Sequence, residues 1–227
     1  MSDNFYFMLL LVLMVLSLGA QNKVARAFNR YNGIRASCGM TGEEVARDLL
    51  QSIGSDVQLT RVSGSLTDHY DPLKGTVGLS TDVCSSYGIA AIAVAAHEIG
   101  HVQQYQEGYR PIRVRNAILP AANIASTAAP WIVLLGAFMG SYRLAMLGAV
   151  LFGAMLLFQL ITLPVELDAS NRALAMLEQG GYIAGEEQNG AKTVLKAAAM
   201  TYVYAALSVL INFLRLLNIA RSARRER

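Results

Sequence analysis

The sequence has few charged residues. Asp, Glu, Lys and Arg make up 15% of its 227 residues and hydrophobic residues make up 54%, whereas soluble domains carry about 25% charged residues. This shortage of charge argues against a soluble protein. The formal net charge of +3 is small, and the basic residues flank the apolar stretches instead of lining one face. We therefore expect no nucleic-acid partner.

Cysteine and histidine are also scarce. The two cysteines, Cys38 and Cys84, form neither a CxxC pair nor a Cys/His cluster, which excludes a zinc ribbon and thioredoxin-like redox chemistry. We expect both thiols to be unpaired. The chain has three histidines, and no internal repeat or low-complexity stretch is visible.

The apolar residues are gathered into four blocks. Residues 5–20 are uncharged and nearly long enough to span a bilayer, which predicts an uncleaved anchor, with a cleaved signal peptide as the alternative. Residues 117–163 hold two apolar runs joined by the turn Met139–Arg143, which predicts a transmembrane hairpin in preference to a buried soluble one. Glycines that would allow a close helix approach are Gly136, Gly140, Gly148 and Gly153. Residues 197–217 either span or lie at the interface, and 218–227 form a basic tail.

A polar region, residues 21–116, separates the first two blocks and reads like a small α+β domain. Thr41 and Glu44 form a capping box for a helix that runs to about Ile53 and stops at Gly54. The elements expected after it are strands at Val57–Val62 and Thr76–Leu79, around a turn at Ser63–Ser65, and a long apolar-rich helix from about Tyr87 to Gln106, ended by Gly108.

The last of these helices carries the motif His97-Glu98-Ile99-Gly100-His101. Positions i and i+4 of a helix share one face, so His97 and His101 can bind one Zn²⁺ ion. Glu98 then lies beside the metal, where it can act as general base towards water. A chance match on a surface helix is the alternative. The apolar residues before the motif predict a buried helix, where unliganded polar groups would be costly.

A catalytic zinc ion needs a third protein ligand and an open position. The residues alone leave two candidates. One is His69, in the string LTDHYDP; its simplest structural role would be that of a turn residue in an edge hairpin. The other is Glu166, in LPVELDAS; its simplest structural role would be that of a negative charge near a helix N-terminus. Pro164 suits the first turn of that helix, which we expect to run to about Glu178 within a connector, residues 164–196.

The strings LTDHYDP, AAHEIGHVQQ and LPVELDAS resemble those of the YugP-type neutral zinc metallopeptidases, a family of bacterial membrane proteins, over nearly the whole chain. The order of elements is more distantly similar to the HtpX-like and CAAX-prenyl-type membrane proteases. That resemblance implies Glu166 as the third ligand, ahead of His69. Those proteases carry an aspartate four residues after the glutamate, where this chain has Ser170. Asp168 is then a candidate for orienting a ligand.

His69 and Tyr70 precede the active-site helix in the place where zincin-like folds have a strand edge that pairs with extended substrates. We therefore expect one of them to stabilise the tetrahedral oxyanion. Asp68 and Asp71, which flank them, can equally well be turn-capping residues.

Together these patterns predict a mainly α membrane protein of about four transmembrane helices with a small α+β, zincin-like (minigluzincin-like) catalytic region. We expect a zinc-dependent metalloendopeptidase with one catalytic Zn²⁺ ion, acting on membrane or membrane-proximal protein substrates. The rivals are a catalytically silent zinc-containing membrane scaffold and a zinc hydrolase of other amides. The oligomeric state is open.

The expected location is a bacterial inner membrane that the chain crosses several times. Basic residues place the catalytic region on the cytoplasmic side. They are Lys23, Arg26, Arg30, Arg35, Arg110, Arg113 and Arg115, with Arg172, Lys192 and Lys196. The opposite side would hold Arg143 and the basic tail, a conflict that disappears if the fourth block does not span.

Overall fold

The computed structural model describes residues 3–225, so the last two residues of the basic tail lie outside it. The chain divides into two compact units. One unit comprises the described residues up to 19, residues 110–164 and those from 201 onwards. The other comprises residues 20–109 and 165–200 and carries the HExxH motif.

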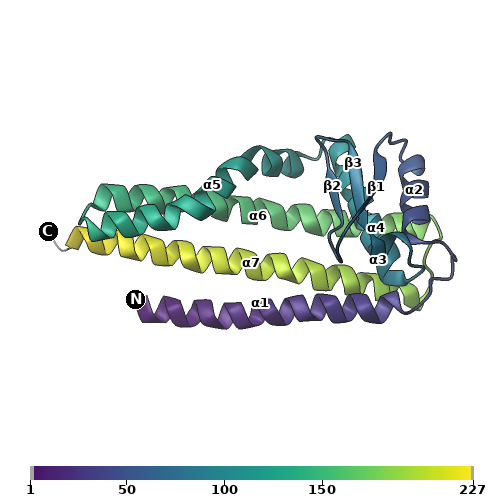
Figure 1. Ribbon diagram of the computed structural model, residues 1–227, viewed down its shortest axis with the longest axis horizontal. Helices are drawn as coiled ribbons and strands as arrows, with labels where there is room; N and C mark the ends of the chain where they lie inside the picture. The colour runs from purple at the N-terminus through teal and green to yellow at the C-terminus, as the bar shows by residue number, and fades with distance from the viewer. Residues whose placement is uncertain (1–2, 226–227) are drawn as a thin grey trace. The chain divides into compact units, whose positions relative to one another are not determined.

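Four helices within the described residues are long and apolar enough to cross a membrane. They are α1 (Asp3–Asn32), α5 (Arg110–Phe138), α6 (Tyr142–Gln179) and α7 (Glu186–Arg225), all drawn in Figure 1. The fourth apolar block is therefore the middle of one 40-residue helix. This length favours the spanning reading of residues 197–217 over the interfacial one.

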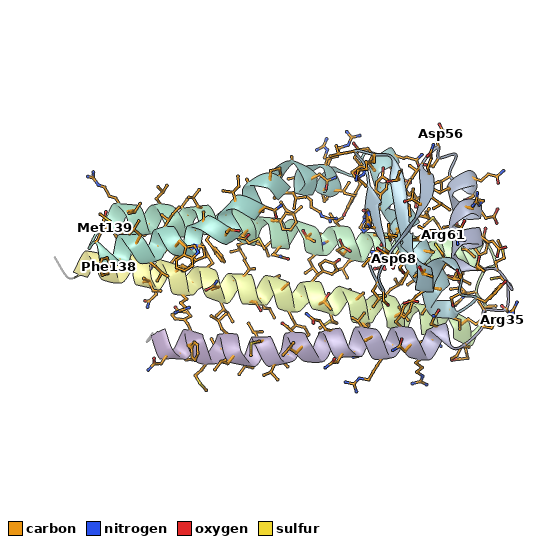
Figure 2. The ribbon with its side chains drawn as sticks, in the orientation of Figure 1. Arg35, Asp56, Arg61, Asp68, Phe138 and Met139 are labelled. Carbon is orange, nitrogen blue, oxygen red and sulfur yellow. The ribbon has the colours of Figure 1, made fainter. Side chains whose placement is uncertain are left out.

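The hairpin of α5 and α6 depends on small residues in its contact. The turn contains Gly140 with φ +63°, a backbone conformation that favours glycine. A Cβ atom on Gly136 would collide with the backbone nitrogen of Ala145, and one on Gly148 would lie 2.7 Å from that of Val133. The expected close approach of these two helices is thus confirmed at Gly136 and Gly148, whereas Gly153 lies near Phe213 of α7. Phe138 and Met139 project from the turn, as Figure 2 shows.

The expected helix start at Pro164 is wrong. The proline lies inside α6, which continues unbroken from the apolar block to Gln179. Proline removes one backbone donor and usually kinks or breaks a helix interior. Here packing holds the helix immediately after Pro164, because Val165, Ala169 and Ala173 are fully buried. Glu166 is consequently a residue of a long, continuous helix.

The second unit contains a three-stranded sheet in the order β1-β3-β2. β1 (Gln58–Val62) pairs parallel to β3 (Thr76–Ser80), so these strands do not form the hairpin that the turn at Ser63–Ser65 indicated. A third strand, β2 (His69–Asp71), pairs antiparallel to β3 and forms one edge of the sheet, at the place where a strand edge was expected from zincin-like folds.

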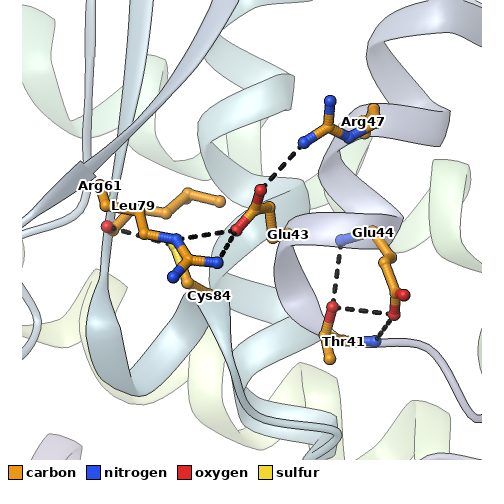
Figure 3. A network of polar contacts seen from close by, with 7 residues as sticks. All are labelled: Thr41, Glu43, Glu44, Arg47, Arg61, Leu79 and Cys84. Carbon is orange, nitrogen blue, oxygen red and sulfur yellow. Dashed lines mark hydrogen bonds and ion pairs between the residues drawn. The ribbon is translucent and has the colours of Figure 1, made fainter.

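Three helices lie beside the sheet, as Figure 1 shows: α2 (Gly42–Ser52), α3 (Thr81–Cys84) and α4 (Ile89–Gln106). The capping box of α2 is present as predicted, with both the Thr41 and the Glu44 side chains bonded to the backbone. Glu43 on the same helix joins two arginines, Arg47 on α2 and Arg61 on β1 (Figure 3). Cys38 and Cys84 are both free thiols.

The helix that carries the motif, α4, is buried over most of its length. Its first two turns are rich in alanine, and Ala90, Ala91, Ala93, Ala95 and Ala96 are completely inaccessible to solvent. Small side chains allow neighbouring elements to pack closely around a helix on all sides. The core of this unit also includes residues from the ends of α1, α6 and α7 that belong to it. The predicted burial of the motif helix is confirmed.

Gly100, inside the motif, sets the distance between α4 and α6. A Cβ atom at this position would lie 2.6 Å from the carbonyl oxygen of Ala169. We expect Gly100→Ala to lower the free energy of unfolding by about 1–3 kcal/mol, because overpacking of a tight contact forces the backbone to shift. Thermal or denaturant unfolding in detergent measures this effect. Gly19→Ala, at a helical glycine with nothing within 4 Å, is the control and should not destabilise the protein.

Candidate metal centre

Three side chains from two helices converge at one point. α4 contributes His97 and His101, one helical turn apart, and α6 contributes Glu166. The Oε2 atom of Glu166 lies 3.3 Å from Nε2 of His97 and 3.6 Å from Nε2 of His101. The imidazole rings are nearly perpendicular, with their centroids 4.8 Å apart. Each residue thus directs one metal-ligating atom to a shared position, and these atoms all lie within 4.8 Å of one another.

The two distances from Glu166 fit a tetrahedral zinc site. Bonds from zinc to nitrogen or oxygen ligands are about 2.0–2.2 Å long, so two ligand atoms of a tetrahedron are about 3.3–3.6 Å apart. Both measured separations from Glu166 fall in that range. Two imidazoles and one carboxylate also form the donor set of several catalytic zinc sites, which keep a fourth position for water or substrate.

The centre is enclosed by protein. The exposed fraction is 3% for Glu166 and 7% for both Glu98 and His101. Burial alone would lower the pKa of the His101 imidazole, but its pairing with Glu166 and the charge of Glu98 outweigh burial and raise it. A proton and a metal ion therefore compete for the same nitrogen, so metal affinity should fall as the pH is lowered.

Glu98 lies between the two histidines in the sequence and shares their buried environment. Burial raises the pKa of the Glu98 carboxyl above its ordinary value, while the neighbouring His97 and His101 act in the opposite direction. A carboxyl group with a raised pKa is a better proton acceptor when ionised, which suits general-base chemistry.

Each histidine has a partner on the ring nitrogen that faces away from Glu166. Nδ1 of His101 lies 3.0 Å from Oε1 of Gln104, and Nδ1 of His97 lies 3.3 Å from the hydroxyl of Ser170. Such partners orient metal-binding imidazoles and leave Nε2 for the ion. Ser170 therefore contacts a ligand although the resemblance led us to look for an aspartate at its position.

Asp168 does not contact a histidine. Its Oδ2 atom accepts hydrogen bonds from Nε2 of Gln104 at 2.8 Å and from Nε of Arg172 at 2.6 Å. Arg172 also donates to Glu107, at the C-terminal end of α4, at 2.6 Å. Asp168 is thus connected to the metal centre by its hydrogen bond with Gln104, which in turn contacts His101.

The structure places His69 away from the group of ligating atoms. Among the described residues that group consists of His97, His101 and Glu166. His69 is exposed on the edge strand β2, and its Nδ1 atom lies 2.9 Å from the carbonyl oxygen of Thr67. The neighbouring Tyr70 is partly buried and packs edge-on against Tyr105 of α4.

The aspartates around His69 have structural partners. Asp71 accepts bonds from the backbone nitrogens of Leu73 and Lys74, as a turn-capping residue does. Asp68, which Figure 2 labels, accepts from the backbone nitrogen and the hydroxyl of Ser80. The capping reading of Asp71 is thereby confirmed, and Asp68 instead connects the loop before β2 to the end of β3.

The residue that sequence reasoning missed is Gln104. It follows His101 by three positions, so it lies on the same face of α4, and this spacing was the one available signal. A glutamine at a fully buried position needs partners for both ends of its amide. Those partners lie on α6 and cannot be recognised from the local sequence.

Comparison with known proteins gives the same picture. Residues 6–221 match the model of a family described as "Putative neutral zinc metallopeptidase". The chain belongs to this family. A similar relative is the "Putative membrane protease YugP" of Bacillus subtilis (strain 168), which is 47% identical over 212 residues, or 93% of this chain and 94% of that protein. No solved structure matches the chain.

Membership of the neutral zinc metallopeptidase family implies a zinc ion, and the side chains present suit one. His97, His101 and Glu166 would hold it, because they form the cluster of possible ligands within the part of the chain that the structure describes. The family relationship also agrees with the four membrane-length helices, since the relative from B. subtilis is named a membrane protease.

Proposed function

We propose that this chain is a membrane-embedded zinc metalloendopeptidase in which Glu98 is the general base. The observation that carries the proposal is the convergence of His97, His101 and Glu166 beside a buried glutamate, with Glu166 at zinc-ligand spacing from both histidines. Three protein ligands with a neighbouring base are typical of an open, catalytic zinc site rather than of a closed, structural one.

The chain's own residues have separate tasks in this mechanism. The bound ion would polarise the scissile carbonyl and make a water molecule more acidic. Glu98 accepts a proton from the attacking water as its oxygen bonds to the carbonyl carbon. Glu98 then passes the proton to the amide nitrogen as the C–N bond breaks. The enclosed position of Glu98 limits the access of other water to the carboxylate.

The edge strand β2 extends the proposal to substrate binding. One edge of β2 pairs with β3, and no other strand among the described residues covers its other edge. An extended peptide can add to such an edge through main-chain hydrogen bonds. We retain His69 or Tyr70 as the group that stabilises the oxyanion. Unchanged turnover in both His69→Ala and Tyr70→Phe would exclude that role.

We also propose that the zinc-binding unit faces the cytoplasm of a bacterial cell and acts on membrane or membrane-proximal proteins. Basic residues at the membrane ends of α1 and α5 support this orientation. They include Lys23, Arg26, Arg30, Arg110, Arg113 and Arg115. Protease cleavage of tags at both termini, in intact cells and in inverted vesicles, tests the topology.

The function itself is tested by incubating the purified protein in detergent with an unfolded protein substrate. We expect cleavage in the presence of zinc, loss of cleavage after treatment with a chelator, and recovery when zinc is added back. Zinc binding without cleavage of any unfolded protein would favour the silent scaffold. Cleavage that a chelator does not affect would contradict the proposed mechanism.

A further inference from the structure

Gln104 is the most completely buried polar side chain close to the metal centre. Its side chain has no exposed surface, although glutamine is a residue type found mostly at protein surfaces. All of its amide groups have partners. Oε1 lies 3.0 Å from Nδ1 of His101, and Nε2 lies 2.8 Å from both the carbonyl oxygen of Val165 and Oδ2 of Asp168.

These contacts determine which way the amide points. A backbone carbonyl can only accept hydrogen bonds. Asp168 also accepts a 2.6 Å bond from Arg172, as an ionised carboxylate does. The donor end of the Gln104 amide must therefore face Val165 and Asp168, because a flipped amide would place its acceptor oxygen against these two acceptors. Its acceptor end is left facing His101.

The orientation of the amide in turn determines the state of the imidazole. Oε1 of Gln104 can only accept, so Nδ1 of His101 must carry a hydrogen atom and donate it. The ring is then oriented with Nε2 towards Glu166, the position where the metal ligands converge. We propose that Gln104 is a positioning residue that α6 uses, through Val165 and Asp168, to hold His101 in its metal-binding orientation.

The inference rests on the proposed zinc site, and it adds a connection between the ligands. Glu166 lies directly after Val165 on α6, so the helix that supplies the third ligand also supplies the carbonyl that anchors Gln104. Arg172 joins Asp168 to Glu107 and holds the end of α4 against the same helix. One hydrogen-bonded chain thereby connects His101 to the helix that carries Glu166.

Gln104→Met tests the inference, because methionine has a similar volume and lacks the amide. Gln106→Met, at an exposed glutamine on the same helix, is the matched control. We expect the dissociation constant for zinc to rise about 10–100-fold in Gln104→Met and to remain unchanged in the control, the range typical for loss of an outer partner of a ligand. Competition with a chromophoric chelator measures it.

A second readout separates orientation from general loss of structure. The chain has three histidines, so a sample labelled with ¹⁵N-histidine and saturated with zinc gives a simple spectrum. In the wild type we expect the Nδ1–H proton of His101 to be shifted downfield and slow to exchange. In Gln104→Met this signal should move or disappear, while the corresponding signal of His97, next to Ser170, stays in place.

The outcomes separate this inference from the proposed function. A wild-type protein that does not bind zinc would refute the metal site itself. Unchanged affinity in Gln104→Met, or reduced affinity with an unchanged His101 signal, would overturn the role of Gln104 alone. If Gln104→Met does not fold, Asp168→Ala removes one of the two amide anchors at a partly exposed position. An unaltered His101 signal in that variant would also overturn the inference.

Discussion

Replacing Glu98 with glutamine is expected to reduce peptide hydrolysis by about 10²–10⁴-fold while zinc remains bound. The amide keeps the size of the side chain but cannot accept a proton from water, and general acid–base catalysis typically contributes a factor of that size. Glu98 is not among the three convergent ligands, so the metal content should not change. Cleavage of an unfolded protein substrate, together with metal analysis of the same sample, gives both quantities.

Glu178→Gln is the control for this experiment. Glu178 lies on α6 and is exposed, so the same chemical change there should leave turnover unaffected. Equal cleavage by Glu98→Gln and the wild type would refute the general-base role and indicate a contaminating protease. Loss of zinc from Glu98→Gln would mean that the glutamate supports the metal rather than the water.

Glu166→Gln is expected to raise the dissociation constant for zinc more than the loss of a residue bonded to a ligand does. That smaller loss typically raises it about 10–100-fold. The change removes an anionic ligand and leaves two imidazoles, which are too few for a stable catalytic site. Hydrolysis should be lost with the metal. Chelator competition and metal analysis of the purified variant measure the affinity.

His69→Ala is the decisive comparison, because the sequence alone left His69 and Glu166 as alternative third ligands. The exposed ring on β2 is not a member of the convergent group, so this variant should hold zinc as tightly as the wild type. Loss of zinc from His69→Ala with retention in Glu166→Gln would reverse the assignment of the third ligand.

The features that were predictable from the sequence depend on residues close together in the chain. The capping box of Thr41 and Glu44 spans four residues, and the pairing of His97 with His101 needs one helical turn. Both follow from helix geometry alone. The membrane-length helices were equally predictable, because the length and composition of an apolar block determine whether a helix can span a bilayer.

The features that were missed depend on contacts between distant segments. The parallel pairing of β1 with β3 requires a register that no local pattern specifies. Pro164 matched the rule for a helix start, but burial of its neighbours keeps α6 continuous. The role of Gln104 needed its partners Val165 and Asp168, which lie more than 60 positions further along the chain.

The order of the ligands along the chain has a consequence for biosynthesis. His97 and His101 precede the α5–α6 hairpin, whereas Glu166 and the groups that anchor Gln104 follow it. A nascent chain that has emerged only as far as the hairpin turn therefore carries two of the three ligands and lacks the anchors. On the proposed assignment, the three ligands cannot come together before both helices of the hairpin have been synthesised. Metal capture would then follow the synthesis of the α5–α6 hairpin and could precede that of α7.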